Sequence, residues 1–92
     1  MKSIMQQDKK CYICGSTRNL ERHHIIHGTA NRKKAEELGL WLWLCPEHHR
    51  GKDSPHFDAN IDRWFKGLAQ QRFEKTHSRE EWMKAAGRNY LE

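Results

Sequence analysis

The alternation of side chains is clearest at residues 40–44, which read LWLWL. Leucine and tryptophan take turns along this segment, so a strand here would be apolar on both faces. The segment LERHHII, residues 20–26, is short and also fits a strand. The sequence GTAN breaks the chain after it, and RKKAEELGL, residues 32–40, predicts a short helix ending at Gly39. The pattern therefore predicts two strands separated by an excursion.

A helix-start signal follows the second strand. Pro46 occupies the position of a first helical residue, and Glu47 places an acid in the first turn. Gly51 and Pro55 then interrupt or end this helix. We therefore expect a helix that carries the HH dipeptide of CPEHH soon after the strand.

The last third of the chain, residues 58–92, is predicted to be helical. Its apolar residues recur at the spacing of one helix face: Ile61, Trp64, Phe65, Leu68 and Phe73. Ser78 followed by Glu81 is a capping-box sequence, which opens a last helix ending near Gly87. We expect the aromatic residues of this region to pack in the core.

Composition limits how this fold can be stabilised. The chain has 92 residues, of which 36% are apolar and 32% charged, so a single domain would have a modest core. Such domains usually need disulfides, a structural metal or a partner subunit. Three cysteines cannot all pair within one chain, and together with seven histidines they favour metal binding in a reducing compartment. Without a signal region or a membrane-spanning apolar run, we expect a soluble, cytoplasmic protein.

The net charge of +5 is concentrated near the predicted strands. From Arg22 to Lys34 there are four basic residues and no acidic one. A basic bias suits a polyanionic partner such as nucleic acid, although many small proteins are mildly basic. Six basic residues are candidates for DNA contacts, and we expect about half of them to reach phosphates: Arg22, Arg32, Lys33, Lys34, Arg50 and Lys52.

Two ligand pairs predict a structural zinc site. Cys11 and Cys14 are separated by two residues, and so are Cys45 and His48. Zinc prefers four tetrahedral sulfur or nitrogen ligands, and a two-residue gap lets one turn offer both side chains to one ion. A redox disulfide in CYIC is the alternative, but no thioredoxin-like βαβ pattern surrounds it. A closed Cys3His site would use every cysteine and supply the stability that the core lacks.

The remaining histidines follow the two pairs in order. CYIC, then ERHHI, then LWLCPEHH resembles the HNH, or His-Me finger, nucleases that carry a zinc knuckle pair. The resemblance covers residues 11 to about 57, with His48 in place of a fourth cysteine. More closely, the chain looks like small nuclease-like proteins of phages and prophages, which share an HHI…NRK…LCPEHH…HF layout and an ending such as GRNYL, residues 87–91.

The resemblance implies a fold and a division of the chain. It implies a small zinc-stapled α+β domain with a ββα-metal finger, in which a two-stranded antiparallel hairpin and a helix surround one divalent metal. Additional C-terminal helices would support that unit. The finger would span residues 11–57, and residues 58–92 would be a helical extension of the same domain. From its own sequence, the segment 1–10 is expected to be a flexible arm or a short helical lead-in.

The resemblance also assigns roles to individual histidines. His24 matches the general base that deprotonates the attacking water, and a neutral imidazole suits that task. His23 and His49 match metal ligands, and His56 is the candidate for another. The catalytic ion would be Mg²⁺, Mn²⁺, Ni²⁺ or Zn²⁺, with imidazole favouring the transition metals. It would stabilise charge on the scissile phosphate and the leaving oxygen.

Two departures from the family pattern affect these assignments. The family often has an asparagine at the start of the second strand, where this chain has Gly39 and Leu40, so Asn31 is the substitute candidate. His49 and His56 are seven residues apart, which is about 10 Å of rise on an unbroken helix. His56 would reach the metal only if the chain leaves the helix and turns back; otherwise it is a surface residue.

Several residues keep simpler interpretations. His27 is expected to face solvent or a phosphate, and His77 to have no functional role. Glu21 is read as an exposed strand residue more readily than as a carboxylate that orients a histidine. Trp41 or Trp43 could stack on a base, although we expect burial of at least one.

The leading hypothesis is a metal-dependent DNA endonuclease, nicking or weakly specific, with double-stranded DNA as the default substrate. Its small surface suggests a homodimer or a protein partner for site choice. The alternative is a non-catalytic zinc-knuckle module that binds nucleic acid or protein. A third reading is a phage structural protein that has kept the fold without activity.

Overall fold

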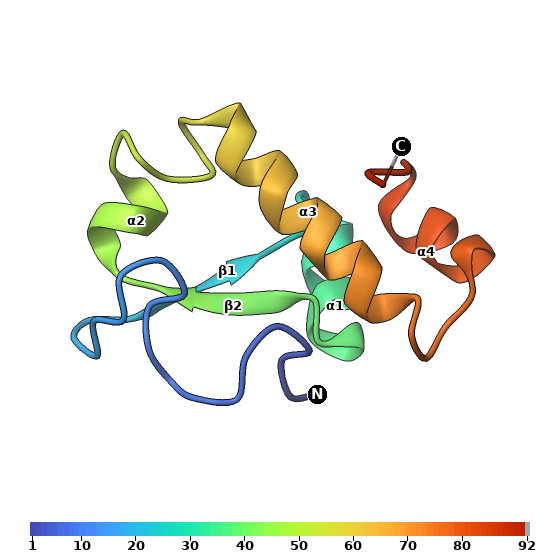
Figure 1. Cartoon of the computed structure of the whole chain (residues 1–92), viewed down its shortest axis with the longest axis horizontal. Helices are drawn as coiled ribbons and strands as arrows, with labels where there is room; N and C mark the ends of the chain where they lie inside the picture. The colour runs from blue at the N-terminus through green and yellow to red at the C-terminus, as the bar shows by residue number, and fades with distance from the viewer. Residues whose placement is uncertain (92) are drawn as a thin grey trace.

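The fold is a small α+β arrangement of one hairpin and four helices within residues 1–91, the part of the chain that the computed structural model describes. The elements follow the order β1 (Glu21–His24), α1 (Thr29–Leu38), β2 (Trp41–Leu44), α2 (Pro46–Arg50), α3 (Ala59–Phe73) and α4 (Arg79–Ala86). Helix α3 crosses over the hairpin, α2 lies at one end of it, and α1 and α4 lie toward the other (Figure 1). No helix among these residues is long and apolar enough to span a membrane.

The register of the hairpin separates its side chains into two faces. The strands pair antiparallel, with Arg22 opposite Trp43 and His23 opposite Leu42. Because directly opposite residues share a face, His23 lies on the face with Leu42 and Leu44, which are fully buried. Arg22 lies on the other face with both tryptophans of β2. The side chains of the adjacent residues His23 and His24 therefore leave β1 on opposite faces of the sheet.

The helices bury one continuous core against the first of these faces. Phe65 and Phe73 on α3 are almost fully buried, and Trp82 on α4 packs beside Phe73 with ring centroids 5.7 Å apart. The predicted capping box is present at the start of α4, and Gly87 ends that helix with a positive φ of 77°. The expected core role of the C-terminal aromatic residues is thus confirmed for these three, whereas Trp64 remains 50% exposed.

The GRNYL ending is fixed to α3 by a buried amide. The side chain of Gln70 is fully buried; its oxygen accepts from the backbone N–H of Tyr90 at 2.7 Å, and its nitrogen donates to Asn89 at 2.9 Å. The indole N–H of Trp82 donates to the carbonyl of Arg88 at 2.8 Å. The tail therefore closes the end of the helical core.

The N-terminal segment lies along the outer edge of β2 and contains no helix, contrary to the short helical lead-in that we considered. The backbone N–H of Ile4 donates to the carbonyl of Gly39, and the N–H of Trp43 donates to the side chain of Gln6 at 2.6 Å. The hydroxyl of Ser3 donates to the carbonyl of Trp41. Because these bonds occupy groups of β2 that would otherwise be unpaired, the segment covers an exposed strand edge.

Candidate metal centres

The four residues of the predicted zinc site lie together at one end of the hairpin. The ligand atoms of Cys11, Cys14, Cys45 and His48 are all within 4.8 Å of one another, so they could hold a metal ion. The sulfur of Cys45 is 3.2 Å from Nδ1 of His48 and 3.8 Å from the sulfur of Cys14. The predicted Cys/His cluster is therefore present, and all three cysteines belong to it.

Local structure explains why these residues converge. Gly15 adopts a positive φ of 80°, and its N–H donates to the carbonyl of Cys11, which closes the cysteine turn. The N–H of Tyr12 donates to the carbonyl of Trp43 at 2.8 Å, which attaches that turn to β2. On the other side, Cys45 is the residue before α2, and Pro46 begins the helix as predicted. A turn and a helix start are thus held against each other by the hairpin.

The cluster favours a thiolate at one of its cysteines. Burial raises the thiol pKa of Cys11, but hydrogen bonds from the backbone N–H groups of Cys14, Cys45 and Ile13 outweigh it and lower the pKa to about 6. The thiolate is the form of cysteine that binds metals. Burial and the neighbouring thiols raise the pKa of Cys45, as expected when several sulfur atoms crowd together without a cation.

A second cluster consists of His23, His49 and His56. One ring nitrogen from each lies within 4.8 Å of the other two, and the Nε2 atoms of His49 and His56 are 3.3 Å apart. His23 is 1% exposed, and its buried Nε2 has no hydrogen-bond partner among the described residues. A buried polar atom without a partner is costly and needs an explanation. Three converging imidazoles with one orphaned nitrogen fit a divalent transition metal.

The short length of α2 resolves the seven-residue spacing between His49 and His56. The helix ends at Arg50 after five residues, and the backbone is extended at Gly51. Ser54 is fully buried in the loop that follows, so the loop is folded back onto the protein. The predicted turning back of the chain at Gly51 and Pro55 is therefore what the structure shows.

Glu21 fixes the orientation of His49. Its carboxylate is 2.7 Å from Nδ1 of His49 and 2.7 Å from the guanidinium of Arg50. The hydrogen bond with His49, together with the charge of Arg50, lowers the pKa of Glu21. Because the carboxylate binds Nδ1, the other ring nitrogen, Nε2, faces His56 in the cluster. Metal-bound histidines commonly have a carboxylate on their second ring nitrogen in this way. Glu21 is half-buried and engaged through both carboxylate oxygens, so its interpretation as an exposed strand residue was wrong.

His24 reaches the same cavity from the next position along β1. A cavity of about 500 Å³ is lined by all three clustered histidines and by His24. The Nε2 atom of His24 is 3.3 Å from a carboxylate oxygen of Glu36 on α1. Burial lowers the pKa of His24 and outweighs the raising effect of Glu36, so its imidazole is neutral at pH 7. Burial likewise lowers the pKa of His23 to about 3.

Asn31 and His27 have contacts that the sequence did not reveal. The amide of Asn31 donates to the backbone carbonyl of His27 at 2.7 Å and does not line the cavity. It therefore braces the turn into α1 instead of facing the histidines. The ring of His27 does line the cavity, and its Nε2 is 2.8 Å from the carboxylate of Asp62 on α3. His27 was expected to face solvent or a phosphate; its partnership with α3 has no local sequence signal.

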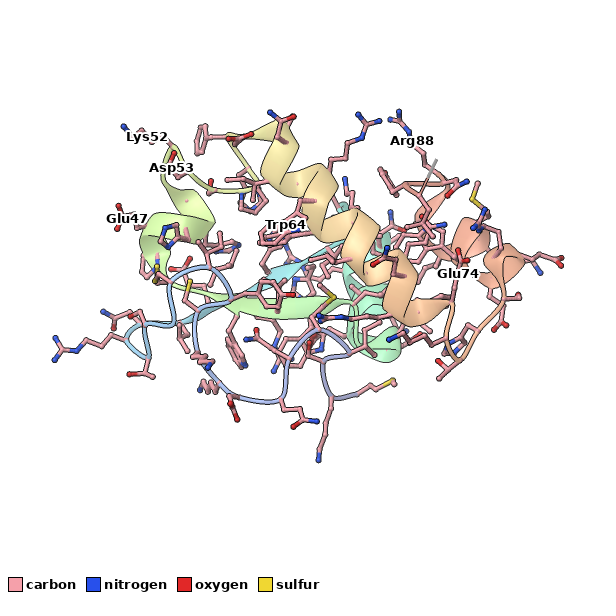
Figure 2. All side chains as sticks on the ribbon, in the orientation of Figure 1. Glu47, Lys52, Asp53, Trp64, Glu74 and Arg88 are labelled. Atoms are coloured by element: carbon pink, nitrogen blue, oxygen red, sulfur yellow. The ribbon has the colours of Figure 1, made fainter. Side chains whose placement is uncertain are left out.

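The six basic candidates are not equivalent. Arg22 and Arg32 line the histidine cavity, and Arg22 also pairs with Glu36. Arg50 is held by Glu21, and the ammonium group of Lys34 lies 3.5 Å from a backbone carbonyl of α4. The other two are exposed outside the cavity lining; Figure 2 shows Lys52 pointing into solvent beyond α2, and the second is Lys33.

The geometry thus gives two separate clusters, one of three cysteines and a histidine and one of three histidines, to which the adjacent His48 and His49 of CPEHH contribute one ligand each. Comparison of the chain with family models, curated proteins and solved structures gave no match.

Proposed function

We propose that this protein is a metal-dependent endonuclease that hydrolyses DNA phosphodiester bonds, built as a ββα-metal finger on a zinc staple. The observation that carries the proposal is the cavity in which neutral His24 lies beside the cluster of His23, His49 and His56. This arrangement combines a proton acceptor with a set of metal ligands, which is what phosphodiester hydrolysis requires.

Zinc is the metal that we propose for the cysteine cluster. Three sulfurs and one imidazole complete a four-ligand set, which is the composition of closed structural zinc sites. No fifth residue is needed, and the cluster joins the cysteine turn to the start of α2. We infer that this site stabilises the fold and takes no part in chemistry.

The histidine cluster would hold the exchangeable ion. Its three neutral nitrogen donors suit Mn²⁺, Ni²⁺, Co²⁺ or Zn²⁺ better than Mg²⁺. When bound, such an ion supplies positive charge that favours phosphate binding and stabilises the departing oxygen. Glu21 keeps His49 in the correct orientation, and the orphaned Nε2 of His23 gains a partner.

His24 would accept the proton of the attacking water. Its pKa is lowered by burial, so it is unprotonated at neutral pH and ready to act as a base. Arg22 and Arg32 both line the cavity and would attract a phosphate. A non-catalytic zinc-knuckle module would explain the cysteine cluster but would leave the converging histidines and the buried nitrogen without a role.

The test is cleavage of supercoiled plasmid with Mn²⁺, Ni²⁺ or Mg²⁺ by wild-type protein and by His24→Ala. We expect the wild type to nick the plasmid and the variant to lose at least about a hundredfold in rate, which is typical of removing a general base. His77→Ala is the matched control, because His77 stacks on Phe73 away from the cavity. DNA binding without cleavage in any metal would refute the proposal.

A further inference from the structure

The histidine cavity continues into two neighbouring cavities. On one side it shares four lining residues with a cavity of about 580 Å³, which also includes Phe57: His27, Gly28, Arg32 and His56. On the other side Arg22 lines both the histidine cavity and a cavity of about 890 Å³ that reaches Trp43. The shared lining residues place these three cavities next to one another, and we call the row from Phe57, past the histidines, to Trp43 the track.

Phe57 is an aromatic residue held in solvent at one end of this track. It is 73% exposed and directly follows His56. The backbone N–H groups of Phe57 and Asp58 both donate to the carbonyl of fully buried Ser54, at 3.1 and 2.8 Å. Asp58 in turn caps α3 by accepting from the N–H of Asn60. The Phe57 ring therefore lies on an anchored turn next to His56 of the histidine cluster. Its exposure shows that it does not serve to fill the hydrophobic core.

Trp43 is the aromatic residue at the other end. It is partly exposed, whereas Trp41 beside it is buried. The ammonium of Lys9 lies 4.8 Å from the centroid of the Trp43 ring, and the guanidinium carbon of Arg22 lies 5.0 Å from it. Both cations thus lie over the ring of Trp43 and place positive charge at this end of the track, where a phosphate could bind.

We propose that the track binds one unpaired nucleic-acid strand, with a base stacked on Phe57 on one side of the scissile phosphate and a neighbouring phosphate held by the cations over Trp43 on the other. This inference rests on the proposed nuclease function and names its substrate class. A base inside a duplex is covered on both faces by its neighbours, so it can stack on a side chain only after leaving the helix. The preferred substrate is therefore DNA with unpaired bases at the cleavage point, such as a bubble or a branch.

The experiment measures binding separately from cleavage. His24→Ala protein, loaded with zinc and without added metal, is titrated against a fluorescein-labelled 30-base-pair duplex and against the same duplex with a central three-nucleotide bubble. We expect the bubble to bind about tenfold more tightly or better. Adding Phe57→Ala should weaken bubble binding about tenfold and leave duplex binding unchanged, because one base–aromatic stack is lost.

Two further variants identify the ring as the cause. Phe57→Tyr keeps an aromatic face and should restore bubble binding, whereas Phe57→Leu should not. Trp64→Ala is the matched control: this aromatic is 50% exposed on α3, lies beside Tyr12 and lines none of the three cavities of the track (Figure 2). It should leave both affinities unchanged.

Equal affinity for duplex and bubble, no binding to either, or equal weakening of both by Phe57→Ala would overturn the inference. The cleavage arm uses wild-type protein with Mn²⁺ on the same two substrates. Bubble-selective binding that depends on Phe57 but gives no cleavage would refute the nuclease function and leave the strand-binding track standing. Equal cleavage of both substrates, unaffected by Phe57→Ala, would support the nuclease and refute the track.

Discussion

Replacing Cys14 with serine tests the proposed zinc staple without disturbing the core. Cys14 is the exposed member of its cluster, whereas Cys11 and Cys45 are buried. Its side chain contributes one sulfur to the group of four and little to packing. An ordinary substitution at such an exposed position changes the free energy of unfolding by no more than about 0.5 kcal/mol. Any larger loss in Cys14→Ser must therefore come from the metal.

The expected loss follows from the number of ligands. Structural zinc contributes roughly 10–16 kcal/mol of apparent binding free energy in small domains, so one ligand of four accounts for about 3 kcal/mol. With a urea dependence of about 1 kcal/mol per molar, the unfolding midpoint should fall by roughly 3 M. The assay is urea unfolding followed by tryptophan fluorescence, with zinc content measured by elemental analysis on the same samples.

Ile13→Ser is the matched control, since Ile13 is 36% exposed in the same turn and offers no metal ligand. It should retain zinc and unfold near the wild-type midpoint. If Cys14→Ser also keeps its zinc and its midpoint, the four residues do not form a structural metal site, and the stability of this lean domain must come from elsewhere.

Three further outcomes are expected. In protein loaded with one equivalent of zinc, Glu21→Gln should weaken Mn²⁺ binding to the histidine cluster by about 10- to 100-fold in calorimetric titration, because His49 loses its carboxylate. Glu47→Gln, on the exposed side of α2 (Figure 2), should leave Mn²⁺ binding unchanged. Ser78→Ala should lower the free energy of unfolding by about 1 kcal/mol in urea melts. Hydrogen bonding from the Ser78 N–H lowers the pKa of Glu81 from its ordinary 4.5. The contribution of this bond to the free energy of unfolding should therefore be present above pH 4.5 and be lost as the pH falls through the lower pKa of the folded state. Glu81→Gln should abolish this pH dependence in thermal melts.

The sequence predicted those parts of the fold that depend on local patterns. The LWLWL alternation became β2, the Pro46 signal began α2, and the Ser78 capping box began α4. The first strand is shorter than the expected 20–26 segment, because pairing with β2 ends at His24. The spacing of ligand pairs was enough to bring the cysteine cluster together, since each pair is contained in one turn or helix start.

Contacts between segments that are distant in the sequence could not be predicted from local patterns. The bond from Glu21 to His49 joins residues 28 positions apart, and that between His27 and Asp62 joins residues 35 apart. Both depend on how α2 and α3 pack on β1, which no local pattern specifies. The N-terminal segment has no periodicity at all, yet it follows β2 because that strand has an unpaired edge. Asn31 was only a substitute for the asparagine that the family has at the start of the second strand, and its amide donates to a backbone carbonyl instead.

The number and lability of the bound ions test the central claim most directly, namely that CPEHH serves two metal centres. Native mass spectrometry should find two metal ions per wild-type chain after incubation with zinc and Mn²⁺, one of which is lost on dialysis. His49→Ala should bind only the retained zinc, and Cys14→Ser should bind that zinc about a hundredfold more weakly, as the loss of about 3 kcal/mol requires. A single ion in the wild type, unchanged in His49→Ala, would contradict the account.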